Sequence, residues 1–171
     1  QALYGFVDDN GNRKYKEAFF LVARKNGKST LLAGLALYNL MCDEKGACCY
    51  SLATKRDQAK IVFNEALNMF KQSPELRKLL KKRKSDLYFP HTMSVFEPLG
   101  RNYDSLDGLN ASFAIIDEAH ALKGTQGREL YEVIKQSQSS RKNPLLITIT
   151  TSGSVIDGIY DQLYEYSSKI C

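Results

Sequence analysis

The chain has 171 residues, of which 43% are hydrophobic and 25% charged, an ordinary globular composition that excludes wholesale disorder. Its length fits one domain, and its longest apolar run, Leu31–Leu37, is too short to span a bilayer. A net charge of +5 and a pI near 9.0 suit an anionic partner such as nucleic acid, although the same balance can mean only solubility.

Strand-like and helix-like segments alternate along the chain. In chain order we expect a strand at Glu17–Ala23, a helix at Lys28–Cys42, a strand at Ala47–Thr54, an amphipathic helix at Arg56–Gln72, a short helix from Pro74, short strands or a hairpin at Asp86–Phe89 and Met93–Phe96, a strand at Ser112–Asp117, a helix at Gly127–Ser139, a strand at Pro144–Thr151 and a helix at Gly158–Lys169. This alternation predicts an α/β fold, with a mainly parallel β-sheet flanked by helices in one domain over residues 1–171.

The segment Ala23–Thr30 (ARKNGKST) lies between the first predicted strand and the first predicted helix. A helix start offers unpaired N–H groups and a positive dipole end to phosphates. Gly27 permits a tight turn, Lys28 would reach the β- and γ-phosphates of a nucleotide, and Ser29 would ligate Mg²⁺. The alternative is a surface turn that matches by chance. The residues expected at the nucleotide are Arg24, Lys25, Asn26, Gly27, Lys28, Ser29 and Thr30.

A second motif, Phe113–Glu118 (FAIIDE), has four apolar residues followed by two carboxylates, the form of a Walker B strand. Asp117 would hold Mg²⁺, and Glu118 would orient or deprotonate the attacking water. The alternative is that the two acids cap the next helix. His120 completes the letters DEAH, and we expect it to contact the fourth main strand or a nearby loop, with a coupling role as the less favoured alternative.

Together the ordered segments ARKNGKST, SLDGLNASFAIIDEAH and ITITTSG resemble the large terminase subunits of tailed phages and prophages. The phosphate loop of that family also lacks the first glycine of GxxxxGK[ST], where Val22 stands here. The resemblance implies a P-loop NTPase of the additional-strand, catalytic-glutamate type, a Mg²⁺-dependent ATPase that drives double-stranded viral DNA into a procapsid. It implies catalytic roles for Glu118, Arg24 and Lys28. It also implies coupling roles for Thr150, Thr151 and Ser152.

Further expectations follow from the same resemblance. The chain would act in the cytoplasm of a bacterial host, away from membranes, in a homo-oligomeric ring with a portal protein and a small terminase subunit. A neighbouring subunit would supply an arginine, for which Arg101, Arg128 and Arg141 are candidates. We expect the chain to be a fragment that lacks the adenine-motif region before it and the nuclease domain after it, and therefore to cleave no DNA.

A basic cluster, Lys78–Lys84, contains the candidate DNA contacts Lys81, Lys82, Arg83 and Lys84. A solvated helix end is the competing interpretation. Thr54–Gln58 is a second possible DNA-contacting or nucleotide-sensing position. Two other functions remain open: a helicase-like or other nucleic-acid-dependent P-loop ATPase, and a nucleotide-dependent binding module without turnover, against which Glu118 argues.

Overall fold

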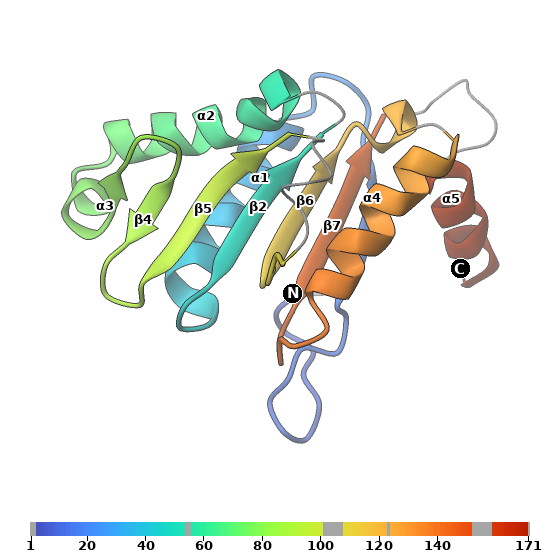
Figure 1. Ribbon diagram of the computed structural model, residues 1–171, viewed down its shortest axis with the longest axis horizontal. Coiled ribbons are helices and arrows are strands. Elements are labelled where there is room, and N and C mark those ends of the chain that lie inside the picture. Colours follow the sequence, from blue (N-terminus) through green and yellow to red (C-terminus); the bar gives the residue numbers. More distant parts are fainter. Residues whose placement is uncertain (1–2, 54–55, 101–107, 123, 152–158, 171) are drawn as a thin grey trace.

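The computed structural model describes residues 3–53, 56–100, 108–122, 124–151 and 159–170 (Figure 1). Within them, a seven-stranded sheet has the order β1-β7-β6-β2-β5-β4-β3. The strands are β1 (Glu17–Leu21), β2 (Cys48–Leu52), β3 (Lys81–Lys82), β4 (Leu87–Phe89), β5 (Ser94–Leu99), β6 (Phe113–Asp117) and β7 (Leu145–Thr150). The helices are α1 (Lys28–Tyr38), which a π-helical turn extends over Asn39–Asp43, α2 (Arg56–Gln72), α3 (Pro74–Leu79), α4 (Gly124–Ser137) and α5 (Ile159–Ile170), with a 3₁₀ turn at Ala119–Ala121.

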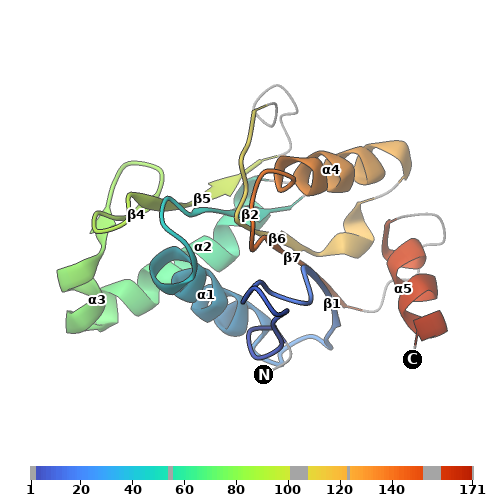
Figure 2. The same cartoon turned by 90° about the horizontal axis from the view of Figure 1, so that it is seen from below.

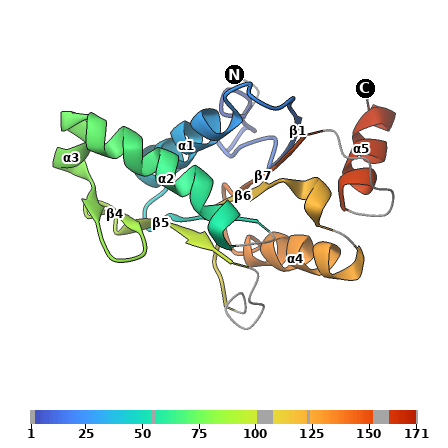
Figure 3. The same ribbon diagram turned by 90° about the horizontal axis from the view of Figure 1, so that it is seen from above.

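Helices cover both faces of the sheet. Two views at right angles to the first place α1, α2 and α3 on one side and α4 on the other, with α5 beyond β1 (Figures 2 and 3). Two apolar clusters fill these layers, one beneath α1 and α2 and the other beneath α4 and α5. The central strands β6 and β7 are buried along their whole length, as their near-continuous apolar sequences predict. Among the described residues, we find no helix long and apolar enough to cross a membrane.

The five strands β1, β7, β6, β2 and β5 run parallel. Strand β7 follows β6 in the sequence but lies between β1 and β6, and this is the additional strand that the family resemblance predicts. In the register, Leu21 lies opposite Thr150, and Asp117 lies opposite Ile149. The carboxyl ends of β1, β6 and β7 therefore meet at one edge of the sheet, where an open parallel sheet binds its ligands.

The region between α2 and β6 differs most from expectation. The predicted hairpin exists as the antiparallel pair β4–β5, but β5 extends to Leu99 and joins the main sheet parallel to β2. The expected strand ended at Phe96, whereas β5 continues through Pro98, a residue that lacks an N–H group and is usual only at edges or bulges of sheets. The basic cluster is a helix end only in part: α3 ends at Leu79, within the cluster, and Lys81–Lys82 form the edge strand β3.

Gly127, in the first turns of α4, is buried against the turn that follows β6. A Cβ atom there would lie 2.6 Å from the carbonyl oxygen of Leu122 and 2.7 Å from its carbonyl carbon. The Leu122 N–H donates to the carbonyl of Ala119, so this backbone is tied down. We expect Gly127→Ala to lower the free energy of unfolding by about 1–3 kcal/mol, measured by urea denaturation.

The matched control is Gly34→Ala in α1. A Cβ at Gly34 meets nothing within 4 Å, so alanine should stabilise that helix by about 0.5–1 kcal/mol. Equal unfolding midpoints for Gly127→Ala and the wild type would contradict the close packing of α4 on this turn.

Candidate nucleotide-binding site

The turn after β1 is shaped by two left-handed residues. Gly27 has φ +68° and precedes α1, and Lys25 has φ +66°. A Cβ at Gly27 would meet nothing within 4 Å, so a side chain would fit there. Glycine is favoured because the backbone has a positive φ, which residues with a Cβ rarely adopt. No side chain among the described residues caps α1, and its first turn carries no acidic residue. The N–H groups at its start are therefore available to an anion.

The acidic pair ends the buried strand β6. Asp117 is only 3% exposed. Glu118 follows in the left-handed conformation, with φ 54° and ψ 49°, at the start of the 3₁₀ turn. A non-glycine residue in this region costs conformational energy and commonly marks a functional position. The N–H of Glu118 donates to Oδ1 of Asp117 at 2.8 Å, which fixes the first carboxylate while the chain turns.

Lys28 joins the two motifs. Its Nζ donates to Oδ1 of Asp117 at 3.1 Å and to Oε1 of Glu118. Burial lowers the pKa of the Lys28 ammonium, but its bonds to both carboxylates outweigh that effect, and the pKa is raised overall. Burial also raises the pKa of Asp117, and Lys28 only partly offsets this increase. The three charged groups thus converge at one point, as the sequence predicts.

These groups line a cleft of about 320 Å³ at the carboxyl edge of the sheet. Arg24 and Ser29 of the phosphate loop line it with Lys28, as do His120 and Ala121 after the acidic pair. Helix α2 also lines the cleft, through Gln58 and Ile61. Sequence reasoning named Gln58 but missed Ile61. The available signal was an isoleucine outside the apolar stripe of an amphipathic helix, and the structure leaves its side chain 51% exposed.

The hydroxyl of Thr150 lies at the end of β7, beside the acidic pair. It accepts a hydrogen bond from the backbone N–H of His120 at 3.2 Å and lies 2.9 Å from Nδ1 of the same residue. The prediction that His120 contacts the fourth main strand is therefore confirmed. Thr151 is buried next to Thr150.

Other predicted residues lie farther from the cleft. Lys25 and Asn26 are exposed in the turn, and Thr30 donates to Glu65 of α2 at 3.0 Å, so their contacts with nucleotide stay predictions. Arg128 is exposed on α4. Arg101 and Ser152 lie outside the described residues.

Arg141 lies at the opposite edge of the sheet, where β2, β6 and β7 begin. It pairs with Glu44 at 2.9 Å and bonds to Asn110 and to the carbonyl of Gly46. These contacts tie three loops together, and they place Arg141 away from the carboxyl edge that carries the cleft. Its guanidinium is already paired, and its side chain is only 14% exposed, so its action in a neighbouring subunit stays a prediction that these contacts do little to support.

The basic cluster occupies the end of the sheet opposite β1. Arg83 is held by Asp86 through two bonds of 2.7 and 2.8 Å, and Lys78 pairs with Glu75. Lys81, Lys82 and Lys84 are exposed.

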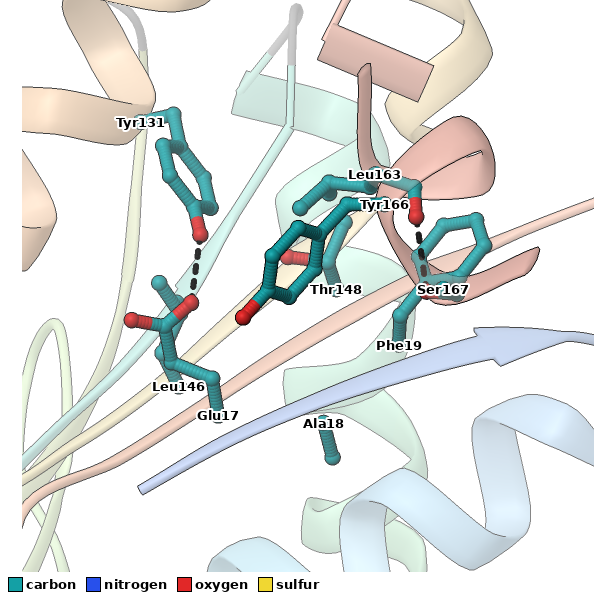
Figure 4. A pocket seen from close by; sticks show the side chains of 9 residues that line it. All are labelled: Glu17, Ala18, Phe19, Tyr131, Leu146, Thr148, Leu163, Tyr166 and Ser167. Atoms are coloured by element: carbon teal, nitrogen blue, oxygen red, sulfur yellow. Dashed lines mark hydrogen bonds between the residues drawn. The ribbon is translucent and has the colours of Figure 1, made fainter. Parts of the chain in front are cut away.

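A smaller cavity of about 120 Å³ lies between β1, α4 and α5 (Figure 4). Its carboxylate, Glu17, accepts a bond from the hydroxyl of Tyr131 at 2.6 Å and pairs with Lys135 at 2.7 Å. The lining is otherwise mostly apolar, with Phe19 and Leu163 among its members. A triphosphate needs cations and free N–H groups, and these are found in the other cleft.

A glycine-lysine-serine turn before a helix, a buried strand ending in two acids, and a strand inserted between the two motifs define a P-loop nucleoside triphosphatase fold. The family model for the ATPase domain of the terminase large subunit matches residues 1–169. The chain belongs to this family.

Individual relatives support this family assignment. The chain is 32% identical over 142 residues to the terminase large subunit of Enterobacteria phage HK97, covering 80% of this chain and 28% of that protein. It is 30% identical over 171 residues to the terminase large subunit of Lactococcus phage p2, covering 95% of this chain and 31% of that protein. The crystal structure of the HK97 bacteriophage large terminase matches with a TM-score of 0.82 at 28% identity, over 94% of this chain and 34% of that one. The chain thus spans about a third of the length of these relatives.

Proposed function

We propose that the chain hydrolyses ATP in the cleft at the carboxyl edge of the sheet, and that this hydrolysis drives double-stranded viral DNA into a procapsid. The observation that carries the proposal is the convergence of Lys28 with Asp117 and Glu118 at the start of a helix. Family membership supplies the link to DNA packaging.

The phosphate loop would bind the β- and γ-phosphates. The N–H groups at the start of α1 would donate to the anion, and Lys28 and Arg24 would add positive charge from the same loop. A γ-phosphate arriving in the cleft would compete with Asp117 and Glu118 for the Lys28 ammonium. Binding of the nucleotide would thereby free the Glu118 carboxylate from Lys28 for its role as base.

The residues present fit a magnesium ion. Ser29 offers a hydroxyl and Asp117 a carboxylate, the hard oxygen donors that Mg²⁺ prefers, and both line the cleft. Mg²⁺ in such sites uses one or two protein carboxylates together with substrate phosphates, so a larger cluster of acidic ligands is not required. When bound, the ion would neutralise charge on the phosphate oxygens.

Glu118 would orient and deprotonate the attacking water. Its backbone turns away from β6 directly after Asp117, so the two carboxylates can serve different partners. A module that only binds nucleotide does not need this second acid. Phosphate release by the chain in MgATP, with and without linear duplex DNA, tests the proposal; no release above that of a Lys28→Met variant would favour such a binding module.

The whole assembly would include DNA, a portal protein, a small terminase subunit and further copies of this chain in a ring in the host cytoplasm. An arginine from a neighbouring copy would complete the site and could raise the rate by roughly 10³–10⁵. The candidates are Arg101, Arg128 and Arg141, of which Arg141 is already paired with Glu44 within its own chain.

The basic cluster provides a test of the DNA surface. Each phosphate contact steepens the dependence of binding on salt, so replacing Lys81, Lys82 and Lys84 with Gln should flatten the slope of log K against log salt by up to about 3. Arg83 is left intact because it supports the turn through Asp86. The measurement is fluorescence anisotropy of a labelled duplex at several salt concentrations.

The control removes the same charge elsewhere, by replacing the exposed Lys14, Lys16 and Lys45 with Gln. Equal slopes in the two triple variants would show that DNA does not contact the cluster.

A further inference from the structure

The side chain of His120 touches both the proposed base and the end of β7. Its Nδ1 lies 3.2 Å from Oε2 of Glu118 and 2.9 Å from Oγ1 of Thr150. Glu118 uses its other carboxylate oxygen, Oε1, to accept from Lys28. The carboxylate is therefore held from two sides, by Lys28 of the phosphate loop and by His120.

The hydrogen bonds determine where the imidazole carries its proton. The hydroxyl of Thr150 donates its one proton to the carbonyl of Thr151 at 2.9 Å. Its oxygen then acts as an acceptor, both for the backbone N–H of His120 and for the ring. The Glu118 carboxylate is also an acceptor. Both neighbours of Nδ1 thus offer acceptor oxygens, and this arrangement favours a ring hydrogen on Nδ1.

Thr150 connects this contact to the phosphate loop. Its carbonyl accepts a hydrogen bond at 3.0 Å from the N–H of Val22, where the chain leaves β1 for the loop. On its other side, Ile149 lies opposite Asp117 in the parallel register with β6. The end of β7 therefore lies between the two halves of the cleft, and within the described part of the chain its contact with the base runs through His120.

We propose that His120 is a positioning residue: its Nδ1–H holds the Glu118 carboxylate in place and fixes that orientation to the end of β7 through Thr150. The inference rests on the proposed role of Glu118 as base. A shift of the β7 end relative to β6 would move Thr150, then His120, and so misalign the base. The contact would thus make the hydrolysis rate depend on the conformation of β7.

Three variants of His120 test the proposal kinetically. Asn places an N–H where Nδ1 lies, Gln places one where Nε2 lies, and Ala has none. Displacing a catalytic group by about 1 Å can lower the rate about 10²-fold. His120→Ala and His120→Gln should therefore lower kcat by about 10–100-fold, while His120→Asn should stay within about threefold of the wild type. The KM for ATP should change little in all three, because the residue acts on the base.

Thr150→Val removes the hydroxyl and should lower kcat to a similar extent. The double variant His120→Ala, Thr150→Val should then be no slower than His120→Ala alone, since the two residues act in one chain of contacts. A His120→Asn variant as slow as His120→Ala would overturn the proposal. So would a fully active His120→Ala variant when Glu118→Gln is inactive. If Glu118→Gln is itself active, the proposed base has failed instead.

A second measurement does not depend on turnover. The chain contains only two histidines, His91 and His120, so ¹⁵N-histidine labelling gives two sets of ring signals, and a His91→Gln variant assigns them. We expect the ring of His120 to carry a hydrogen on Nδ1, and Thr150→Val to change its ¹⁵N shifts. A ring protonated on Nε2 alone would overturn the proposal, whatever the kinetics show.

Discussion

Replacing Glu118 with Gln is expected to lower the rate of ATP hydrolysis by about 10²–10⁴-fold, the contribution typical of a general base. Glutamine keeps the size of the side chain and can remain near Lys28, but it cannot take a proton from water. Nucleotide binding should persist. It should even tighten, because the neutral amide competes less strongly with phosphate for the Lys28 ammonium.

Two measurements separate these effects: phosphate release under saturating MgATP, and titration calorimetry with a slowly hydrolysed ATP analogue. The matched control is Glu129→Gln, which removes one exposed carboxylate from α4. If Glu118→Gln hydrolyses ATP as fast as Glu129→Gln, the second acid of the pair is not the base.

Lys28→Met is expected to abolish nucleotide binding and hydrolysis, with a loss of at least 10²–10³-fold in rate, the cost of removing one preorganised charge from a developing anion. The same change should destabilise the fold. The side chain of Asp117 is 5% exposed and that of Lys28 14% exposed, so removing the ammonium leaves a buried carboxylate without its cation. We expect a loss of about 1–3 kcal/mol in unfolding free energy at neutral pH.

The destabilisation should depend on pH in a defined direction. Burial already raises the pKa of Asp117, and loss of Lys28 would raise it further. A carboxyl group whose pKa is raised by folding binds its proton more tightly in the folded state, so stability falls as pH rises through that range. The deficit of Lys28→Met should therefore shrink as the pH is lowered. Lys25→Met, in the exposed part of the loop, is the control; equal midpoints for both variants at neutral pH would contradict the ion pair.

The residue pattern predicted the fold class and the convergence of the two motifs, but not the order of the strands. The phosphate loop and the acidic pair are local motifs, and their convergence follows from the rule that ligands bind at the carboxyl ends of parallel strands. Strand order is different, because no periodicity in Leu145–Thr150 indicates that this segment lies between β1 and β6. That placement was available only from the family resemblance.

Side-chain partners were partly predictable. The contact between His120 and the fourth main strand was anticipated, but not that the hydroxyl of Thr150 would be its partner. The left-handed turn at Glu118 determines this arrangement, and a single-sequence pattern carries no signal for positive φ at a glutamate. The length of β5 was also missed, because Pro98, which opposes Ser51 of β2, is a residue that sequence patterns place at a strand end rather than within a strand.

The short strand β3 also bears on how copies of this chain behave at high concentration. It ends the sheet with two residues, both exposed lysines. An open sheet edge is a template on which another chain can add a strand, and brevity and positive charge both discourage that addition. Lys81 and Lys82 would thereby protect the domain from edge-to-edge aggregation. Their replacement by threonine or valine would raise the β-propensity of this edge and remove its charge, and would thereby favour fibrous self-association.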